Sequence, residues 1–213
     1  MPASDFKARL LSRARRAGVA VLPHQIDQLE QYCELLARWN VKVNLTALPL
    51  QPLTDSTVDR LLIEPLVAAR LIPDSASAWI DLGSGGGSPA LPLKIVRPNL
   101  RLLMVEAKSR KAAFLREAIR TLNLESATVE NVRFEEFARQ SPASAQVLTV
   151  RAVRPDQTLM DAVTLLLKPA GLLLLFHSGA LPTLPGFQAR QTVGLGPGEA
   201  AQVTALRRTD QPM

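Results

Sequence analysis

The sequence contains one cysteine and two histidines among its 213 residues. Cys33 has no partner for an intramolecular disulfide, and a cysteine-rich zinc site is excluded, which fits a reducing compartment. His24 and His177 lie far apart and belong to no metal-ligand spacing, so we expect no bound metal. An apolar signal segment and an apolar run of membrane-spanning length are also missing. We therefore expect a cytoplasmic protein that contacts no membrane.

Aromatic residues make up only 4% of the chain, but apolar residues make up 47%, which is enough for a substantial core. Lysine and arginine outnumber aspartate and glutamate by 25 to 19, which gives a net charge of +6 and an isoelectric point near 10.1. This excess is compatible with a polyanionic partner such as RNA. Charge alone does not decide the matter, because many soluble proteins are mildly basic.

The N-terminal part predicts helices over residues 5–17, 24–40 and 55–70, with Pro65 kinking or breaking the third. The first has an apolar stripe and a basic face. Two interpretations of that face remain open, namely a solvated surface and an RNA-phosphate contact. Cys33 lies on the apolar seam of the second helix and is expected to be a packed residue rather than a nucleophile.

From residue 78 the pattern alternates between strands and helices. Strands are expected at 78–82, 101–106, 127–131, 147–150 and 171–176, and helices at 91–96, 109–122 and 159–167. This alternation predicts an α/β fold with a parallel, doubly wound, Rossmann-like sheet over residues 76–213, behind a helical extension over residues 1–75. Two edge strands are expected near 188–193 and 201–206.

The segment from Asp81 to Pro89 is a glycine-rich turn directly after the first strand of this sheet. Gly83 and Gly85 let the backbone turn sharply and approach a ligand. Asp81 would repel a pyrophosphate but attract the sulfonium and ammonium of S-adenosylmethionine. Glu106 closes the next strand, where a carboxylate can accept ribose hydroxyls. Because NAD sites use such an acid too, the argument against an NAD-dependent oxidoreductase depends on Asp81, and a solvated strand end is the alternative for Glu106.

The methyl acceptor is indicated only by what is missing. An Asn/Asp-Pro-Pro-aromatic tetrad, typical of adenine amino methylation, does not occur, and neither does Pro-Cys, typical of cytosine carbon-5 methylation. Guanine N7 needs neither device, because its lone pair is free at neutral pH and catalysis can rest on alignment and charge stabilisation.

Several segments resemble the bacterial small-subunit (16S) ribosomal RNA guanine-N7 methyltransferases, the glucose-inhibited division protein B family. The resemblance spans roughly residues 25–180 and is strongest over 79–137. The segments that carry it are Trp39 to Thr46 (Trp-Asn-Val-Lys-Val-Asn-Leu-Thr), Asp81 to Leu93, Glu106 with Arg110-Lys111 and Phe114-Leu115-Arg116, Asn131 to Phe137, and Arg151-Ala152.

This resemblance implies an S-adenosylmethionine-dependent rRNA methyltransferase with no metal. It implies a cofactor pocket lined by Gly83, Ser88, Glu106, Phe134, Glu135 and Arg151. Phe134 and Glu135 would contact the adenine. Arg151 would hold the cofactor or the incoming guanine, since an arginine donates readily to guanine O6; an internal salt bridge is the alternative role for this residue.

Three departures from the family pattern stand beside the matches. The usual His-Ile-x-Asp-Ser stretch is Leu61-Leu62-Ile63-Glu64-Pro65, so its histidine is missing and its aspartate is Glu64. A late Lys-Gly is Ser178-Gly179, and Ser88 replaces a usually apolar residue.

Small-subunit rRNA, or the subunit itself, is the expected partner. The residues expected to contact it are Lys7, Arg9, Arg13, Arg16, Lys42, Arg110 and Lys111. Two other functions remain open. One is a methyltransferase for a small molecule or protein, and the other is a non-catalytic RNA-binding relative, which the departures favour.

Overall fold

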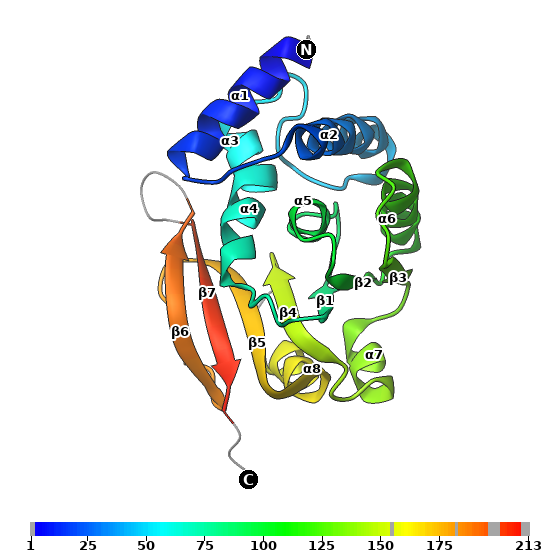
Figure 1. The fold of residues 1–213 in the computed structure, drawn as a ribbon. Coiled ribbons are helices and arrows are strands. Elements are labelled where there is room, and N and C mark those ends of the chain that lie inside the picture. The colour runs from blue at the N-terminus through cyan, green and yellow to red at the C-terminus, as the bar shows by residue number, and fades with distance from the viewer. Residues whose placement is uncertain (1–2, 154–155, 182, 196–200, 210–213) are drawn as a thin grey trace.

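The computed structural model describes residues 3–153, 156–181, 183–195 and 201–209. A seven-stranded sheet runs through its centre in the order β3-β2-β1-β4-β5-β7-β6, with helices on both faces (Figure 1). The strands are β1 (Ala78–Leu82), β2 (Arg101–Val105), β3 (Ala127–Glu130), β4 (Ala145–Arg151), β5 (Leu167–Ser178), β6 (Phe187–Gly194) and β7 (Ala201–Arg208).

Strands β1 to β5 are all parallel, and β7 pairs antiparallel with both β5 and β6. The predicted α/β fold with a parallel Rossmann-like sheet is therefore confirmed for the first five strands. Both expected edge strands are present and form the antiparallel end of the same sheet. Since the carboxyl ends of parallel strands meet at one edge, the segments after β1, β2 and β4 are brought together there.

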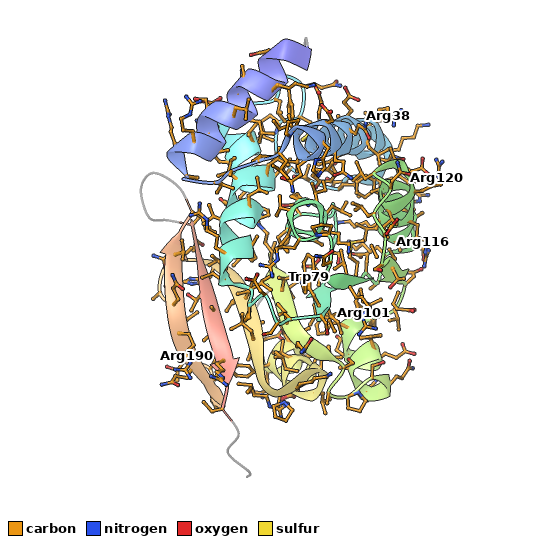
Figure 2. The ribbon with its side chains drawn as sticks, viewed as in Figure 1. Arg38, Trp79, Arg101, Arg116, Arg120 and Arg190 are labelled. Carbon is orange, nitrogen blue, oxygen red and sulfur yellow. The ribbon has the colours of Figure 1, made fainter. Side chains whose placement is uncertain are left out.

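Each face of the sheet has its own hydrophobic layer. On one face, α5 (Ala90–Val96) and α6 (Ser109–Thr121) pack with Trp79, Met104 and Phe176 in one buried cluster. Trp79 points from β1 into this layer, as Figure 2 shows. On the other face, α7 (Phe134–Gln140) and α8 (Gln157–Leu166) cover Ile80 and Leu148. Alternate residues of each strand thus enter opposite layers, as the period of a strand requires.

The N-terminal helices belong to the first of these layers. α1 (Ala3–Arg16) and α2 (Pro23–Val43) contribute Leu10 and Leu29, both fully buried, to the cluster that also contains Trp79 of the sheet. α2 ends at Asn44, which takes a left-handed conformation with φ of 51°. The extension is therefore packed continuously with the sheet.

The third predicted helix is divided into four short segments. α3 (Asp55–Val58) leads into a π turn (Asp59–Ile63), and α4 (Glu64–Ala68) then ends in a 3-10 turn (Ala69–Leu71). Pro65 explains the interruption, since its ring would clash with the carbonyl four residues earlier in a regular α-helix. The π turn moves that carbonyl aside, as π bulges do inside α-helices.

One element was not expected from the sequence, namely the seven-residue α7. β5 also begins directly after α8 and is twice as long as the predicted 171–176. Both differences arise where polar residues interrupt the apolar pattern, while packing against the sheet fixes the backbone. No helix among the described residues is both long enough and apolar enough to span a membrane.

Candidate functional site

A cavity of about 360 Å³ opens at the carboxyl edge of the sheet, over the glycine-rich turn. Its wall is built by α2 and the loop after it, the π turn, the turn after β1, the end of β4, and α6. The lining residues are Leu36, Leu45, Thr46, Ala47, Leu48, Arg60, Leu61, Gly83, Ser84, Gly85, Gly86, Ser88, Lys111, Arg151 and Ala152. Gly83, Gly85, Ser88 and Arg151 of the predicted cofactor site are thus brought together.

The glycine-rich turn is shaped by close backbone approaches that a side chain would prevent. Gly87 has a φ of +85°, and a Cβ there would lie 2.4 Å from a methyl carbon of Leu91. At Gly86 a Cβ would lie 3.1 Å from the carbonyl oxygen of Leu45. The Tyr32 hydroxyl donates to the carbonyl of Gly86 at 2.7 Å. The N-terminal extension therefore holds the turn in place.

Asn40 organises the loop that covers this turn. Its side-chain oxygen accepts from the backbone amides of Leu45 (2.7 Å) and Thr46 (2.9 Å), and its amide group donates to the Thr46 carbonyl at 3.0 Å. Trp39 packs edge-on against Phe114 of α6, with ring centroids 5.8 Å apart. The Trp-Asn…Asn-Leu-Thr segment is thus a structural device that places Leu45 and Thr46 over the cavity.

Asp81 is buried below the turn, with only 1% of its surface exposed. One carboxylate oxygen accepts from the Thr149 hydroxyl, which in turn accepts from the indole N–H of Trp79. The other oxygen, Oδ2, has no hydrogen-bond partner among the described residues. Burial raises the pKa of Asp81 to about 6, against the lowering effects of the hydroxyls of Ser84 and Thr149. A buried, unpartnered carboxylate oxygen fits a cationic ligand such as a sulfonium or ammonium group.

Glu106 links the glycine-rich turn to the end of β2. Its two carboxylate oxygens accept from the backbone amides of Gly85 and Lys108, both at 2.8 Å. The side chain is therefore not a solvated strand end, since the residue is 7% exposed. Each oxygen keeps a second lone pair, which can accept a ribose hydroxyl.

Phe134 and Glu135 begin α7, one strand further along the same edge. Asn131 ties this segment to the end of β2, because its amide donates to the carbonyls of Glu106 (2.8 Å) and Ala107 (3.1 Å). Glu135 pairs with Arg133 at 2.7 Å, and its Oε2 is buried without a partner among the described residues. Burial raises the pKa of Glu135, but the hydrogen bonds from its own backbone amide and from Arg133 outweigh this and hold that pKa below its usual value.

Arg151 forms the cationic floor of the cavity. Its guanidinium pairs with Glu64 and donates to the Ser88 hydroxyl at 3.0 Å, and it lies over the Phe176 ring at 5.1 Å from the centroid. The internal salt bridge that was the alternative role for Arg151 is therefore formed. The remaining N–H donors of its guanidinium have no partner among the described residues. Burial lowers the pKa of Arg151 to about 10, although Glu64 opposes this, so the group stays charged at neutral pH.

Two of the sequence departures meet in this network. Pro65 has no N–H, so the carbonyl of Leu61 lacks the donor that a regular helix would supply. The Ser88 hydroxyl donates to that carbonyl at 2.8 Å. The serine at position 88 therefore compensates for the proline at position 65, and it also connects Arg151 to the π turn.

Arg60 was missed by the sequence reasoning. It lines the cavity and pairs at 2.9 Å with the same carboxylate oxygen of Glu64 that binds Arg151. One carboxylate thus serves two arginines, which leaves this trio with a net positive charge. The only sequence signal was the four-residue spacing between Arg60 and Glu64, which puts both on one face of a helix.

The predicted RNA-contacting cations fall into two groups. Three of those on α1 form internal ion pairs, namely Lys7 with Asp27, Arg9 with Asp55, and Arg13 with Asp55 and Asp59. Each of these three charges has a counter-charge within the fold, and a contact between α1 and RNA stays a prediction. Arg16, Lys42, Arg110 and Lys111 have no carboxylate within 4 Å in the described part of the chain, and Lys111 lines the cavity.

Comparisons with known proteins agree with this arrangement. The sequence profile of GidB, described as rRNA small subunit methyltransferase G, matches residues 25–182. The chain belongs to the GidB family. The ribosomal RNA small subunit methyltransferase G of Roseiflexus sp. is 41% identical over 154 residues, which cover 71% of this chain and 64% of that protein. The Paracoccus denitrificans protein of the same name is 38% identical over 151 residues, covering 69% and 73%. The chain thus spans just under two thirds of the length of the Roseiflexus relative.

Solved structures confirm the fold of a class I methyltransferase. A SAM-dependent methyltransferase from Aquifex aeolicus aligns with a TM-score of 0.57 and 11% identity, covering 75% of this chain and 96% of that one. TYW2 of P. horikoshii, solved in complex with MeSAdo, aligns with a TM-score of 0.56 and 16% identity, covering 70% and 62%. The predicted family is confirmed, and the solved structures that share its fold include a SAM-dependent methyltransferase.

Proposed function

We propose that this GidB protein transfers a methyl group from S-adenosylmethionine to guanine N7 of small-subunit ribosomal RNA, in the cytoplasm. The observation that carries the proposal is a buried Asp81 oxygen without a partner among the described residues, on the strand that leads into the glycine-rich turn of a cavity lined by cations. The carboxylate suits the cationic cofactor, and the cavity suits an anionic substrate. The names of the family and its relatives support rRNA as that substrate.

The cofactor supplies an electrophilic methyl group on a sulfonium centre. In the proposed site Asp81 attracts its positive charge, Glu106 accepts the ribose hydroxyls, and Phe134 and Glu135 border the adenine. Arg151 keeps guanidinium donors for the target guanine, whose O6 is a preferred acceptor for arginine. Guanine N7 carries no proton, so the reaction needs no general base. The protein needs only to align the guanine with the methyl group and to stabilise the charge that develops.

Arg60 and Lys111 are proposed to hold the RNA backbone at the mouth of the cavity, together with Lys42 and Arg110 nearby. Arg60 and Lys111 line the cavity from two different elements, the π turn and α6. The loss of the family histidine and lysine is compatible with this arrangement, because Arg60, Arg151 and Lys111 remain as cations around the cavity.

The test is transfer of a labelled methyl group from S-adenosylmethionine to small ribosomal subunits from cells that lack this protein. We expect incorporation that maps to a guanine N7, and we expect Asp81→Asn to lower both this incorporation and the affinity for the cofactor. Arg101→Gln is the matched control, since Arg101 is an exposed residue at the opposite end of β2 (Figure 2). Retained cofactor binding with no incorporation into subunits or free rRNA would contradict the proposal.

A further inference from the structure

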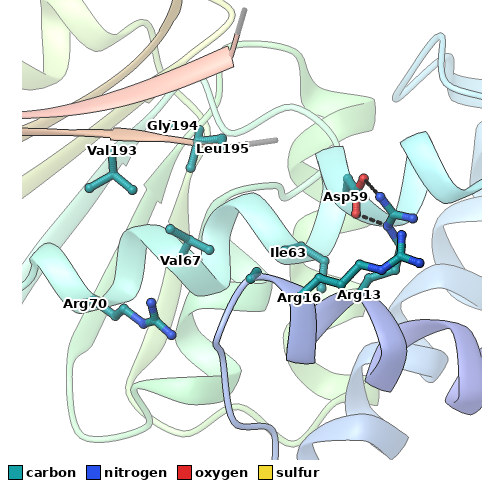
Figure 3. Close-up of a pocket in the computed structure, with 10 residues that line it drawn as sticks. Arg13, Arg16, Asp59, Ile63, Val67, Arg70, Val193, Gly194 and Leu195 are labelled. Atoms are coloured by element: carbon teal, nitrogen blue, oxygen red, sulfur yellow. Dashed lines mark hydrogen bonds and ion pairs between the residues drawn. The ribbon is translucent and has the colours of Figure 1, made fainter. Parts of the chain in front are cut away.

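A second cavity, of about 430 Å³, lies between the end of α1, the π turn with α4, and the end of β6 (Figure 3). Its walls are mixed: apolar side chains from α4 and β6 face arginines from α1 and from the 3-10 turn. The lining residues are Arg13, Arg16, Ala17, Asp59, Ile63, Val67, Arg70, Val193, Gly194 and Leu195. None of these residues lines the cavity over the glycine-rich turn.

The charges of the described residues around this second cavity do not cancel. Arg13 and Asp59 pair with each other, as Figure 3 shows, so the one carboxylate of the lining is already used. Arg16 is exposed and has no carboxylate within 4 Å among the residues described. Within the described residues, the guanidinium of Arg70 donates only to the carbonyl of Gly18. Two guanidinium charges thus border the cavity without a counter-charge among the described residues, beside apolar walls that weaken screening by water.

The second cavity lies along the same edge of the sheet as the first. Arg151 of β4 is in register with Phe176 of β5, Phe176 with Val203 of β7, and Val203 with Val193 of β6. Three strand spacings of about 4.8 Å separate Arg151 from Val193, which is roughly 14 Å across the sheet. A linear polymer bound at the first cavity can therefore also contact the second cavity.

We propose that the second cavity binds a phosphodiester group of the RNA substrate, at a position away from the target nucleotide. This inference rests on the proposed function, which supplies the polyanion. Arginine suits the role, because its planar fork donates two hydrogen bonds to one phosphate and is weakly hydrated. The apolar wall of Ile63, Val67 and Val193 covers the sugar side of the same nucleotide.

The experiment measures the salt dependence of small-subunit RNA binding by the full chain and its variants Arg16→Gln, Arg15→Gln and Arg70→Gln. Arg15 is the matched control, since it is exposed on the same turn of α1 but does not line the cavity. We expect Arg16→Gln to weaken binding about tenfold and to reduce the slope of log K against log salt by about 0.7 to 0.9, the value for one phosphate contact. Arg15→Gln should leave the slope unchanged.

Arg70→Gln should lower the affinity like Arg16→Gln, provided that its unfolding temperature is unchanged. Equal effects of Arg15→Gln and Arg16→Gln would overturn the inference, because they would show diffuse attraction to α1 rather than a bound phosphate. A wild-type slope for Arg16→Gln would overturn it as well. Wild-type protein that neither binds nor methylates the RNA would instead count against the proposed function.

Discussion

Ser88 offers a direct way to test how the two sequence departures depend on each other. Its hydroxyl donates to the Leu61 carbonyl at 2.8 Å and accepts from Arg151 at 3.0 Å. Ser88→Ala removes both bonds in a partly buried position. A lost hydrogen bond costs about 1 kcal/mol, and one to a charged group costs somewhat more. We expect Ser88→Ala to lower the free energy of unfolding by about 2 kcal/mol.

Pro65→Ala tells the two bonds apart. The alanine regains an N–H that can donate to the Leu61 carbonyl, so in this background Ser88→Ala should cost about 1 kcal/mol less. Pro65→Ala also loosens the unfolded chain, but that effect is present on both sides of a double-mutant cycle and cancels. The coupling energy therefore isolates the shared carbonyl.

This coupling energy is measured by urea unfolding, followed by circular dichroism, of the wild type, the two single variants and the double variant. Ser12→Ala, on the exposed face of α1, is the control. Its cost should stay within about 0.5 kcal/mol. If Ser88→Ala costs the same with Pro65 and with alanine at that position, the serine does not compensate for the proline. The explanation given for both departures would then be refuted.

Three further predictions follow from the same structure. Glu64→Ala leaves the buried Arg151 without its carboxylate and should cost about 3 kcal/mol or more in urea unfolding, whereas exposed Glu125→Ala should be nearly neutral; equal costs would show that the pair is not buried. Affinity for S-adenosylmethionine should rise as the pH increases through about 6, because a pKa raised to that value keeps Asp81 protonated and uncharged below it. In calorimetric titrations the affinity of Asp81→Asn should not change with pH over this range. A wild-type affinity that also stays constant would contradict the assignment. We also propose that residues 1–75 and 76–213, which share one hydrophobic cluster, unfold together; two separate calorimetric transitions would exclude this.

Most local elements and the chemistry of the glycine-rich turn could be predicted from the order of the residues alone. Apolar periodicity predicted the long helices, and β1 was predicted residue for residue, because such patterns depend only on which neighbours along the chain are apolar. The positions of Asp81 and Glu106 at strand ends indicated a site at one edge of the sheet, since parallel strands bring their carboxyl ends together. Short elements such as α7 were not predicted, because seven residues carry too little periodic signal.

Which charges lack an internal partner among the described residues depends on how the elements pack together. Arg13 and Arg16 look equivalent in the sequence, yet Asp59, 46 residues further along the chain, pairs with Arg13, and Arg16 has no carboxylate within 4 Å among the described residues. Glu64 pairs with Arg151, which lies 87 residues further along the chain. Arg60 pairs with the same carboxylate oxygen of Glu64. Such pairings arise where separate elements pack together, and no local pattern records them. The second cavity has the same origin, because α1, α4 and β6 each supply one wall.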